Sequence, residues 1–431
     1  MDETPNTPRK IKYQRPRGTY DILPEDWVYL DMILNSCQEM ARFYGFQRIE
    51  TPIFENAEIF TRGIGAGTDI VEKEMFLIKG GRKKPLALRP EGTAGLVRAY
   101  IEKGMGNWIK PVRLWHFGPF FRHEKPQAGR FRQFWQFGFE SFGRQNPIID
   151  AQTVQIIVNV LRKLQIKDTI THINSIGCDK CRPRYLKKLK DYLEPYREYL
   201  CLDCKKRLKS NILRTLDCKN EGCHEILANA PQTFESLCKK CRQHFKGVLE
   251  FIETLELPYE LDHSLVRGLD YYNRTVFEIF AQEKDKAKIA LAGGGRYDDL
   301  IDILGGNPSF ACGAAVGVER VIQLMREKSV KVKKSTVPQL FLAQLGISAK
   351  REALQLFEKF RKANVLIAKD FSRDSLKSQL SKANRLGIRY VLILGQKEVL
   401  EGEIILRDMK TKTQKKIELD KVVEKVKKKI K

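Results

Sequence analysis

Hydrophobic and polar residues alternate along 131–140, which predicts a β-strand with two different faces. One face is mostly aromatic and needs a core to pack against: Phe131, Gln133, Trp135, Phe137 and Phe139. The apolar segment 113–122 predicts a second strand, and the run KPQAGR between the two predicts the loop of a hairpin.

The other face of the predicted strand carries groups that suit a ligand. Arginine binds phosphate in a bidentate way, an aromatic ring stacks on a base, and an amide or carboxylate binds an amine. A solvated, charged sheet face would show the same alternation, so the pattern alone leaves both interpretations open. The groups are Arg132, Phe134, Gln136 and Glu140, with Arg122 and Glu124 beside them on the first strand and the loop after it.

The flanking segments predict a mixture of helices and strands. Helical spacing covers 28–44 and ends at Gly45, and 46–55 predicts a strand with Pro52 at an edge or bend. A helix around 151–164 follows the hairpin, and strand signals return at 264–280. We therefore expect an α+β domain built on an antiparallel sheet.

Changes in composition divide the chain into parts. The polar segment 1–16 predicts a flexible N-terminal arm before a large α+β domain over 17–325. Within that domain, cysteine and lysine dominate 178–257 and strand signals vanish, which predicts a mainly helical insertion. A lysine-rich linker, 326–334, then leads to an α/β domain over 335–431 with a mostly parallel sheet.

Length and charge narrow the function classes. A chain of 431 residues is longer than a single hydrophobic core usually supports, so we expect two or three domains. It has no apolar run of membrane-spanning length and opens without a signal segment, which predicts a cytoplasmic protein. The net charge is +25, and 331–431 holds 26 Lys and Arg against 11 Asp and Glu. This excess favours a polyanionic partner such as nucleic acid, although a solvated lysine-rich surface would produce it too.

Eight of the ten cysteines lie in the predicted insertion. Cys178-x2-Cys181 followed by Cys201-x2-Cys204 fits the spacing of a four-thiolate zinc site. A third pair is Cys238-x2-Cys241, and between the pairs lie Cys218, Cys223 and His224. Spacing alone favours a structural zinc ion in this region.

Four blocks, in order, resemble the histidyl-tRNA synthetases of class II: LRPEGTAGLVRAYIE, FRHEKPQAGRFRQFWQFGFESFG, LVRGLDYYNRTVFE, and AGGGRYDDL with CGAAVGVERVIQL. The resemblance covers nearly the whole chain. It implies an antiparallel class II catalytic domain, a helical insertion and a C-terminal anticodon-binding domain, assembled as a homodimer. It also implies that L-histidine reacts with ATP, accompanied by Mg²⁺, to give histidyl-adenylate and pyrophosphate, and that histidine then passes to its tRNA.

The resemblance implies roles for the ATP-side residues. Arg122 and Arg267 would be catalytic, both against the α-phosphate, with Arg267 also at the histidine carboxylate. Arg132 would reach the leaving phosphates. The adenine would meet Glu124 and Phe134, and Arg320 would close the other side of the ATP, against the adenine or the γ-phosphate. A structural ion pair of Arg267 with Asp270 or another carboxylate is the alternative.

The resemblance also implies a histidine pocket. The ammonium group would bind Glu91, Thr93 and Gln136, and Arg267 would hold the carboxylate. A carboxylate and phenols suit an imidazole with two distinct nitrogens, and these would be Glu140, Tyr271 and Tyr272.

Two features of the chain depart from what the resemblance requires. Zinc is not a requirement of the family, so bound zinc is left open but not favoured, and no metal-binding residue is assigned. Lys125 stands in the strand-joining loop where arginine is common, which leaves the readout of the tRNA acceptor end open. Two other functions remain to be separated from the enzyme: a synthetase-like regulatory protein, and a tRNA-sensing or zinc-binding module.

Overall fold

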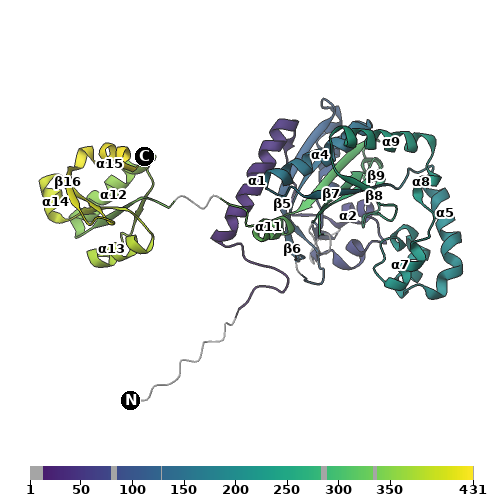
Figure 1. Cartoon of the computed structure of the whole chain (residues 1–431), viewed down its shortest axis with the longest axis horizontal. Helices are drawn as coiled ribbons and strands as arrows, with labels where there is room; N and C mark the ends of the chain where they lie inside the picture. The colour runs from purple at the N-terminus through teal and green to yellow at the C-terminus, as the bar shows by residue number, and fades with distance from the viewer. Residues whose placement is uncertain (1–12, 79–84, 128, 283–288, 333–336, 431) are drawn as a thin grey trace, which may run out of the picture. The chain divides into compact units, whose positions relative to one another are not determined.

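The structure is a computed structural model that describes residues 13–78, 85–127, 129–282, 289–332 and 337–430. It forms two compact units, Met1–Val332 and Lys333–Lys431 (Figure 1). Most of the predicted N-terminal arm and the end of the predicted linker, 333–334, lie outside the described residues.

An eight-stranded sheet forms the centre of the first unit. Neighbouring strands are antiparallel except at the two ends, where β1 pairs with β5 and β7 with β8 in parallel. The order across the sheet is β1 (Gln47–Arg48), β5 (Val112–Phe121), β6 (Gln133–Phe142), β11 (Ala311–Gly317), β10 (Ile289–Arg296), β9 (Asn273–Ala281), β7 (Thr169–Ser175) and β8 (Tyr259–Leu261).

The predicted hairpin is present as β5 and β6, in a register that pairs Phe120 with Phe134 and Phe117 with Phe137. Its two faces divide as the alternation predicts. Phe137 and Phe139 are fully buried in the main core, and Trp135 packs against the same core. The opposite face is therefore left for polar side chains.

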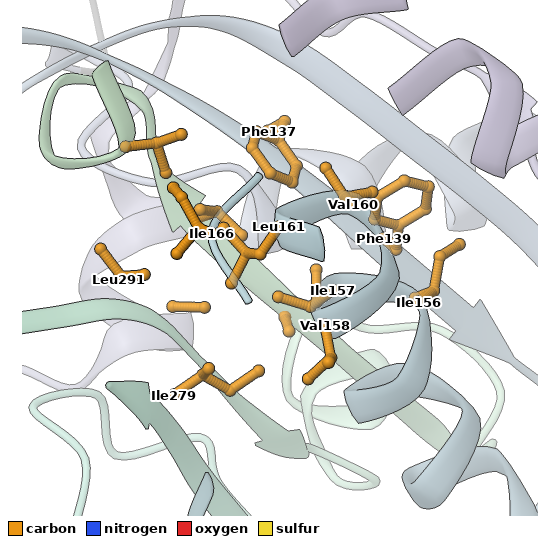
Figure 2. Close-up of a cluster of buried hydrophobic side chains, with 14 of the residues drawn as sticks. Phe137, Phe139, Ile156, Ile157, Val158, Val160, Leu161, Ile166, Ile279 and Leu291 are labelled. Carbon is orange, nitrogen blue, oxygen red and sulfur yellow. The ribbon is translucent and has the colours of Figure 1, made fainter. Parts of the chain in front are cut away.

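Four helices cover the aromatic face of the sheet: α1 (Pro24–Tyr44), α4 (Pro147–Lys163), α9 (Lys239–Thr254) and α11 (Val318–Glu327). Figure 2 shows Val158 and Leu161 of α4 packed near Phe137, Ile279 and Leu291 of the strands. This apolar layer makes the sheet a rigid floor for whatever binds on its other side.

Two local predictions were wrong in their extent. The predicted strand 46–55 is interrupted, since β2 (Phe54–Asn56) leaves the main sheet and pairs with β4 (Leu86–Leu88) in a small sheet completed by β3 (Leu77–Ile78). Pro52 lies in this interruption, where a residue without an N–H cannot continue a ladder. The helix that precedes the predicted linker continues to Glu327, and Val330 beyond it is still buried in the main core.

The insertion is helical, and none of 178–257, all of which the structure describes, is in a strand. Its helices are α5 (Arg182–Leu193), α6 (Leu202–Ser210), α7 (Glu221–Leu227), α8 (Thr233–Ser236) and α9. Within the first unit, α5, α7 and α8 lie at the end opposite α1 (Figure 1). The helix α9 differs from the others, because Phe245, Val248 and Ile252 on one of its faces belong to the main core.

Three helices on the other side of the sheet belong to a second apolar cluster: α2 (Ala57–Ile64), α3 (Thr93–Glu102) and α10 (Leu300–Ile303). The insertion contributes to this cluster through Tyr185, Leu189 and Leu208. The insertion and the ligand side of the sheet thus share one packed region.

The second unit has a five-stranded sheet in the order β13 (Ile367–Lys369), β12 (Leu340–Gln344), β14 (Tyr390–Leu394), β15 (Glu403–Asp408) and β16 (Gln414–Glu418). The first three strands are parallel to one another. The strand β15 is antiparallel to both of its neighbours, β14 and β16, so the sheet is more mixed than predicted. The short connection 409–413 between β15 and β16 permits only an antiparallel return. The helices of this unit are α12 (Ile347–Lys362), α13 (Leu376–Arg385), α14 (Gln396–Glu401) and α15 (Val422–Ile430). Neither unit contains, within the described ranges, a helix long and apolar enough to cross a membrane.

Candidate active site

A cavity of about 690 Å³ opens on the side of the sheet opposite α4. Residues of β6, β9, β10 and β11 form its floor, and parts of the insertion form one wall. Six of the residues predicted from the sequence line it together: Arg122, Glu124, Phe134, Gln136, Arg267 and Arg320.

Arg122 is held in place from two directions. Its Nε donates a hydrogen bond to the carbonyl oxygen of Pro90 at 2.8 Å. Its guanidinium carbon lies 5.3 Å from the ring centroid of Phe134, and Glu124 lies 3.6 Å from Nη1. The cation and the aromatic ring are therefore ordered side by side at the cavity edge, the arrangement that a phosphate and a base require.

Arg132 is the one predicted ATP-side residue that does not line the cavity. Its Nε lies 3.4 Å from the carbonyl oxygen of Glu124 and its Nη1 lies 3.5 Å from that of Arg17. The side chain thus contacts the segment before α1. Arg130 lines the cavity instead, with Nη1 3.3 Å from a carboxylate oxygen of Glu124. Alternation could not indicate Arg130, because it lies in the loop and outside the strand.

Arg267 pairs with Glu278 of β9 and not with Asp270. The amide of Asn211 donates to Asp270 at 2.7 Å, so that carboxylate belongs to a separate contact. The guanidinium lies against Gly293, where an added Cβ would stand only 2.4 Å from its carbon. The Nε of Arg267 is buried and has no hydrogen-bond partner among the described residues, while the residue as a whole lines the cavity.

The remaining predicted histidine ligands form a buried hydrogen-bonded network. Glu91 accepts the backbone N–H groups of Thr93 and Ala94 at 2.7 and 2.8 Å at the start of α3, where a carboxylate is stabilised. The hydroxyl of Thr93 donates to Glu140 at 2.9 Å, and the hydroxyl of Tyr271 donates to Glu91 at 3.3 Å. The guanidinium carbon of Arg267 lies 5.7 Å from the ring of Tyr272, which joins this network to the cavity.

Tyr297 completes the network, as its hydroxyl donates to Glu140. Its ring lies 5.7 Å from that of Tyr271 and 6.5 Å from that of Tyr272. The position facing Glu140 on β11 is Gly313, where a Cβ would lie 1.4 Å from the carboxylate. Glu140 therefore depends on the absence of a side chain in the neighbouring strand.

Burial sets the charge of this network. It raises the pKa of Glu140 from 4.5 to about 8; the hydrogen bonds from Tyr297 and Thr93 oppose the rise, and nearby Glu91 adds to it. Burial also raises the pKa of Glu91, although the two backbone N–H groups offset part of the effect. Two carboxyl groups lie close together, so the site favours a ligand that brings positive charge or N–H donors.

The raised pKa predicts how stability depends on pH. The folded protein retains a proton on Glu140 up to about pH 8, whereas the unfolded chain releases it near pH 4.5. The free energy of unfolding should therefore fall as the pH rises through this range, because the unfolded state binds fewer protons there. Glu140→Gln removes the titration, so wild type should lose on the order of 3–5 kcal/mol relative to the variant between pH 4.5 and 8. Urea unfolding of both proteins across this range measures the difference, and parallel curves would contradict it.

Several lining residues were not among those predicted from the sequence. Arg214 of the insertion donates to Asp69 at 2.8 Å, and Arg207 lies 3.9 Å from the same carboxylate. Glu319 accepts the backbone N–H of Trp135 at 2.7 Å and the hydroxyl of Tyr20 at 2.7 Å. These contacts join segments far apart in sequence, so no local pattern could reveal them.

Comparison with known proteins agrees with this geometry. The histidyl-tRNA synthetase family model matches residues 18–177 and 199–321, and an anticodon-binding domain model matches 339–429. A curated histidine–tRNA ligase from Dehalococcoides mccartyi is 43% identical over 97% of this chain and 100% of its own length. One from Pelotomaculum thermopropionicum is 42% identical over 96% and 98%. The crystal structure of apo S. aureus histidyl-tRNA synthetase is 33% identical, covers 96% of this chain and 99% of its own, and superposes with a TM-score of 0.79. The chain therefore belongs to the histidyl-tRNA synthetase family of class II aminoacyl-tRNA ligases.

Proposed function

We propose that the cavity activates L-histidine with ATP, as the first step of the histidine–tRNA ligase reaction. A carboxylate oxygen of histidine attacks the α-phosphorus, the bond from that phosphorus to the bridging oxygen breaks, and pyrophosphate leaves. The attacking carboxylate is already ionised, so the step needs no general base and depends on positioning and on cations. The observation that carries the proposal is that Arg122, Arg267 and Arg320 line one cavity beside the buried Glu140 network.

The ATP side is assigned from the lining residues. Arg122 binds the α-phosphate and Phe134, 5.3 Å from it, stacks on the adenine. Glu124 approaches the base, and Arg320, which donates to the carbonyl oxygen of Ala290 at 2.5 Å, closes the other side. Arg130 replaces Arg132 as our candidate for the leaving phosphates, because it lines the cavity. Mg²⁺ enters as the counter-ion of the ATP phosphates.

The histidine side uses the free polar atoms of the site. Gln136 lines the cavity, and its Oε1 has no hydrogen-bond partner within the described ranges, so it accepts from the ammonium group together with Glu91 and Thr93. The guanidinium of Arg267, which lines the cavity, donates to the carboxylate. The imidazole lies among Glu140, Tyr271 and Tyr272. A carboxylate with phenols can form hydrogen bonds to both nitrogens of the imidazole. A pocket lined by alkyl side chains could not form them.

In the second step, a hydroxyl of the 3′-terminal ribose of the tRNA attacks the carbonyl carbon of the adenylate, and AMP leaves. We propose that the second unit holds the anticodon arm, since it matches an anticodon-binding domain and lies in the most basic part of the chain. We also propose a homodimer with one site per subunit, acting in the cytoplasm, where histidine tRNA and ATP are available.

Amino-acid-dependent ATP–pyrophosphate exchange across all twenty amino acids, without tRNA, tests the proposal. Exchange with histidine alone is expected. A folded protein that binds tRNA but gives no exchange would instead indicate a regulatory or tRNA-sensing role, since neither needs adenylate formation.

The division into two units gives a further prediction. A chain ending at Val332 retains the whole cavity, so it should keep histidine-dependent exchange within about 3-fold while losing tRNA charging by about 100-fold. Steady-state aminoacylation measured beside exchange separates the two. Equal losses in both assays would contradict independent units.

A further inference from the structure

The eight cysteines of the insertion gather into two clusters of four. One cluster, the outer cluster, consists of Cys178, Cys181, Cys238 and Cys241. The other, the inner cluster, consists of Cys201, Cys204, Cys218 and Cys223. The pairing suggested by spacing was therefore wrong, because the first two Cys-x2-Cys pairs belong to different clusters. The third pair completes the outer cluster, and the single cysteines complete the inner one.

The sulfur positions match a tetrahedral metal site. With Zn–S bonds of 2.3 Å, neighbouring sulfurs of a tetrahedron lie about 3.8 Å apart. In the outer cluster, the Sγ atoms are separated by 3.7 Å (Cys178–Cys181), 4.0 Å (Cys178–Cys238) and 3.8 Å (Cys181–Cys241). In the inner cluster, Cys201 and Cys218 are 3.7 Å apart. All ten cysteines are free, and these separations far exceed the roughly 2 Å of a disulfide bond.

The backbone around both clusters favours thiolates. Cys181, Cys201 and Cys238 stand at the N-terminal caps of α5, α6 and α9, where the helix dipole stabilises negative charge. Backbone N–H groups also point at sulfur, from Cys178 to Cys181 at 3.2 Å and from Cys201 to Cys223 at 3.3 Å. Such N–H···S contacts orient metal ligands and offset their charge.

Apolar packing alone does not account for the outer cluster. Leu237 is the only buried residue in this small core that is not a cysteine. The core nevertheless joins the points where the chain leaves the sheet after β7 and returns through α9. A metal would supply the stabilisation that so few apolar groups cannot.

We propose that the insertion binds two structural Zn²⁺ ions, one in each cluster, as four-thiolate sites. The outer ion fastens the base of the insertion to the catalytic domain. The inner ion orders a wall of the cavity, because Cys201 and Cys218 line it and Arg207 and Arg214, between them in sequence, hold Asp69. Neither ion takes part in the reaction, since the four thiolates leave no open position.

Metal analysis of the full-length protein, purified without added metal, tests the proposal. Mass spectrometry should find two zinc ions per chain. The double variants Cys178→Ser/Cys181→Ser and Cys201→Ser/Cys204→Ser should each retain one. Cys37→Ala is the matched control: this buried cysteine of α1 lies outside both clusters, so two zinc ions should remain. Substoichiometric zinc that both double variants retain unchanged would overturn the proposal, as would bound iron in place of zinc.

Because a variant can fail to fold, a second measurement uses the wild-type protein. A mercurial that modifies thiols should release two equivalents of zinc to a colorimetric chelator, and Co²⁺ in place of zinc should show the intense visible absorption of tetrahedral cobalt. Eight freely titrating thiols without metal release would contradict the assignment.

The inner site makes a separate kinetic prediction, which rests on the proposed function. The inner double variant should raise the KM for ATP about tenfold in the exchange assay, because the wall that carries Arg214 loosens. Metal content and exchange are independent readouts. Loss of one zinc ion with unchanged kinetics would show that the inner ion does not position the cavity wall. An inactive wild-type protein that holds two zinc ions would refute the proposed function and leave the zinc proposal intact.

Discussion

Arg267→Ala is expected to lower histidine-dependent ATP–pyrophosphate exchange about 10³-fold while leaving tRNA affinity within about 2-fold. The side chain lines the cavity, so its positive charge can stabilise the negative charge that accumulates at the α-phosphorus. Removing one preorganised donor from such a site typically costs 10²–10³ in rate. Exchange kinetics and filter binding of tRNA, each on protein checked by circular dichroism, provide the measurements.

The pair with Glu278 supplies the control for this prediction. If Arg267 acted only as a structural partner, Glu278→Gln would break the same ion pair and cause the same loss. We expect that variant to keep exchange within about 10-fold, because Arg267 remains. Unfolding of Arg267→Ala together with loss of tRNA binding would instead make the residue structural.

Glu140→Gln is expected to raise the KM for histidine about 30-fold and the KM for ATP less than 3-fold. The carboxylate accepts from Thr93 and Tyr297, so an amide would turn one donor toward another donor. Above about pH 8, where Glu140 is ionised, the amide also lacks the negative charge that the carboxylate can offer to the ring. Substrate titrations in the exchange assay separate the two KM values, and equal increases would remove Glu140 from the histidine pocket.

Tyr297→Phe is the matched companion to this variant. It removes a single hydroxyl that contacts Glu140 and leaves the ring packing against Tyr271 and Tyr272. We expect a smaller rise in the histidine KM, about 5-fold, again without a change for ATP. A larger effect than that of Glu140→Gln would indicate that the phenol of Tyr297, and not Glu140, recognises the imidazole ring.

Alternation was sufficient to predict the hairpin and its two faces, because strand geometry places every second residue on the same side. Phe134 and Gln136 therefore line the cavity, as predicted, and Phe137 and Phe139 are in the core. The same rule did not place Arg132 correctly. This residue precedes the first residue of β6, and its guanidinium lies near the backbone carbonyl oxygen of Arg17. Strand periodicity is reliable only inside a ladder, and long side chains at its ends follow their nearest partners.

Contacts between distant segments lay beyond sequence reasoning. The partner of Arg267 depends on how β9 and β10 bring Glu278 beside it. The grouping of the cysteines depends on the fold of the whole insertion, since sequence proximity favoured joining Cys181 with Cys201, whereas α9 returns Cys238 to the first pair. Both cases require the three-dimensional path of the chain.

The glycines opposite Glu140 and Arg267 bear on how tolerance to mutation should be distributed over this floor. Gly313 and Gly293 contact substrate through no side chain, yet any larger residue would occupy the space of the groups they face. Alanine is already large enough to clash, because its Cβ would stand 1.4 Å from Glu140 at position 313 and 2.3 Å from Arg267 at position 293. A saturation scan should rank them among the least tolerant positions of the sheet, because any side chain there would overlap the group that the glycine faces. The glycines of β10 and β11 therefore help to determine which ligand binds, together with Glu140 on β6.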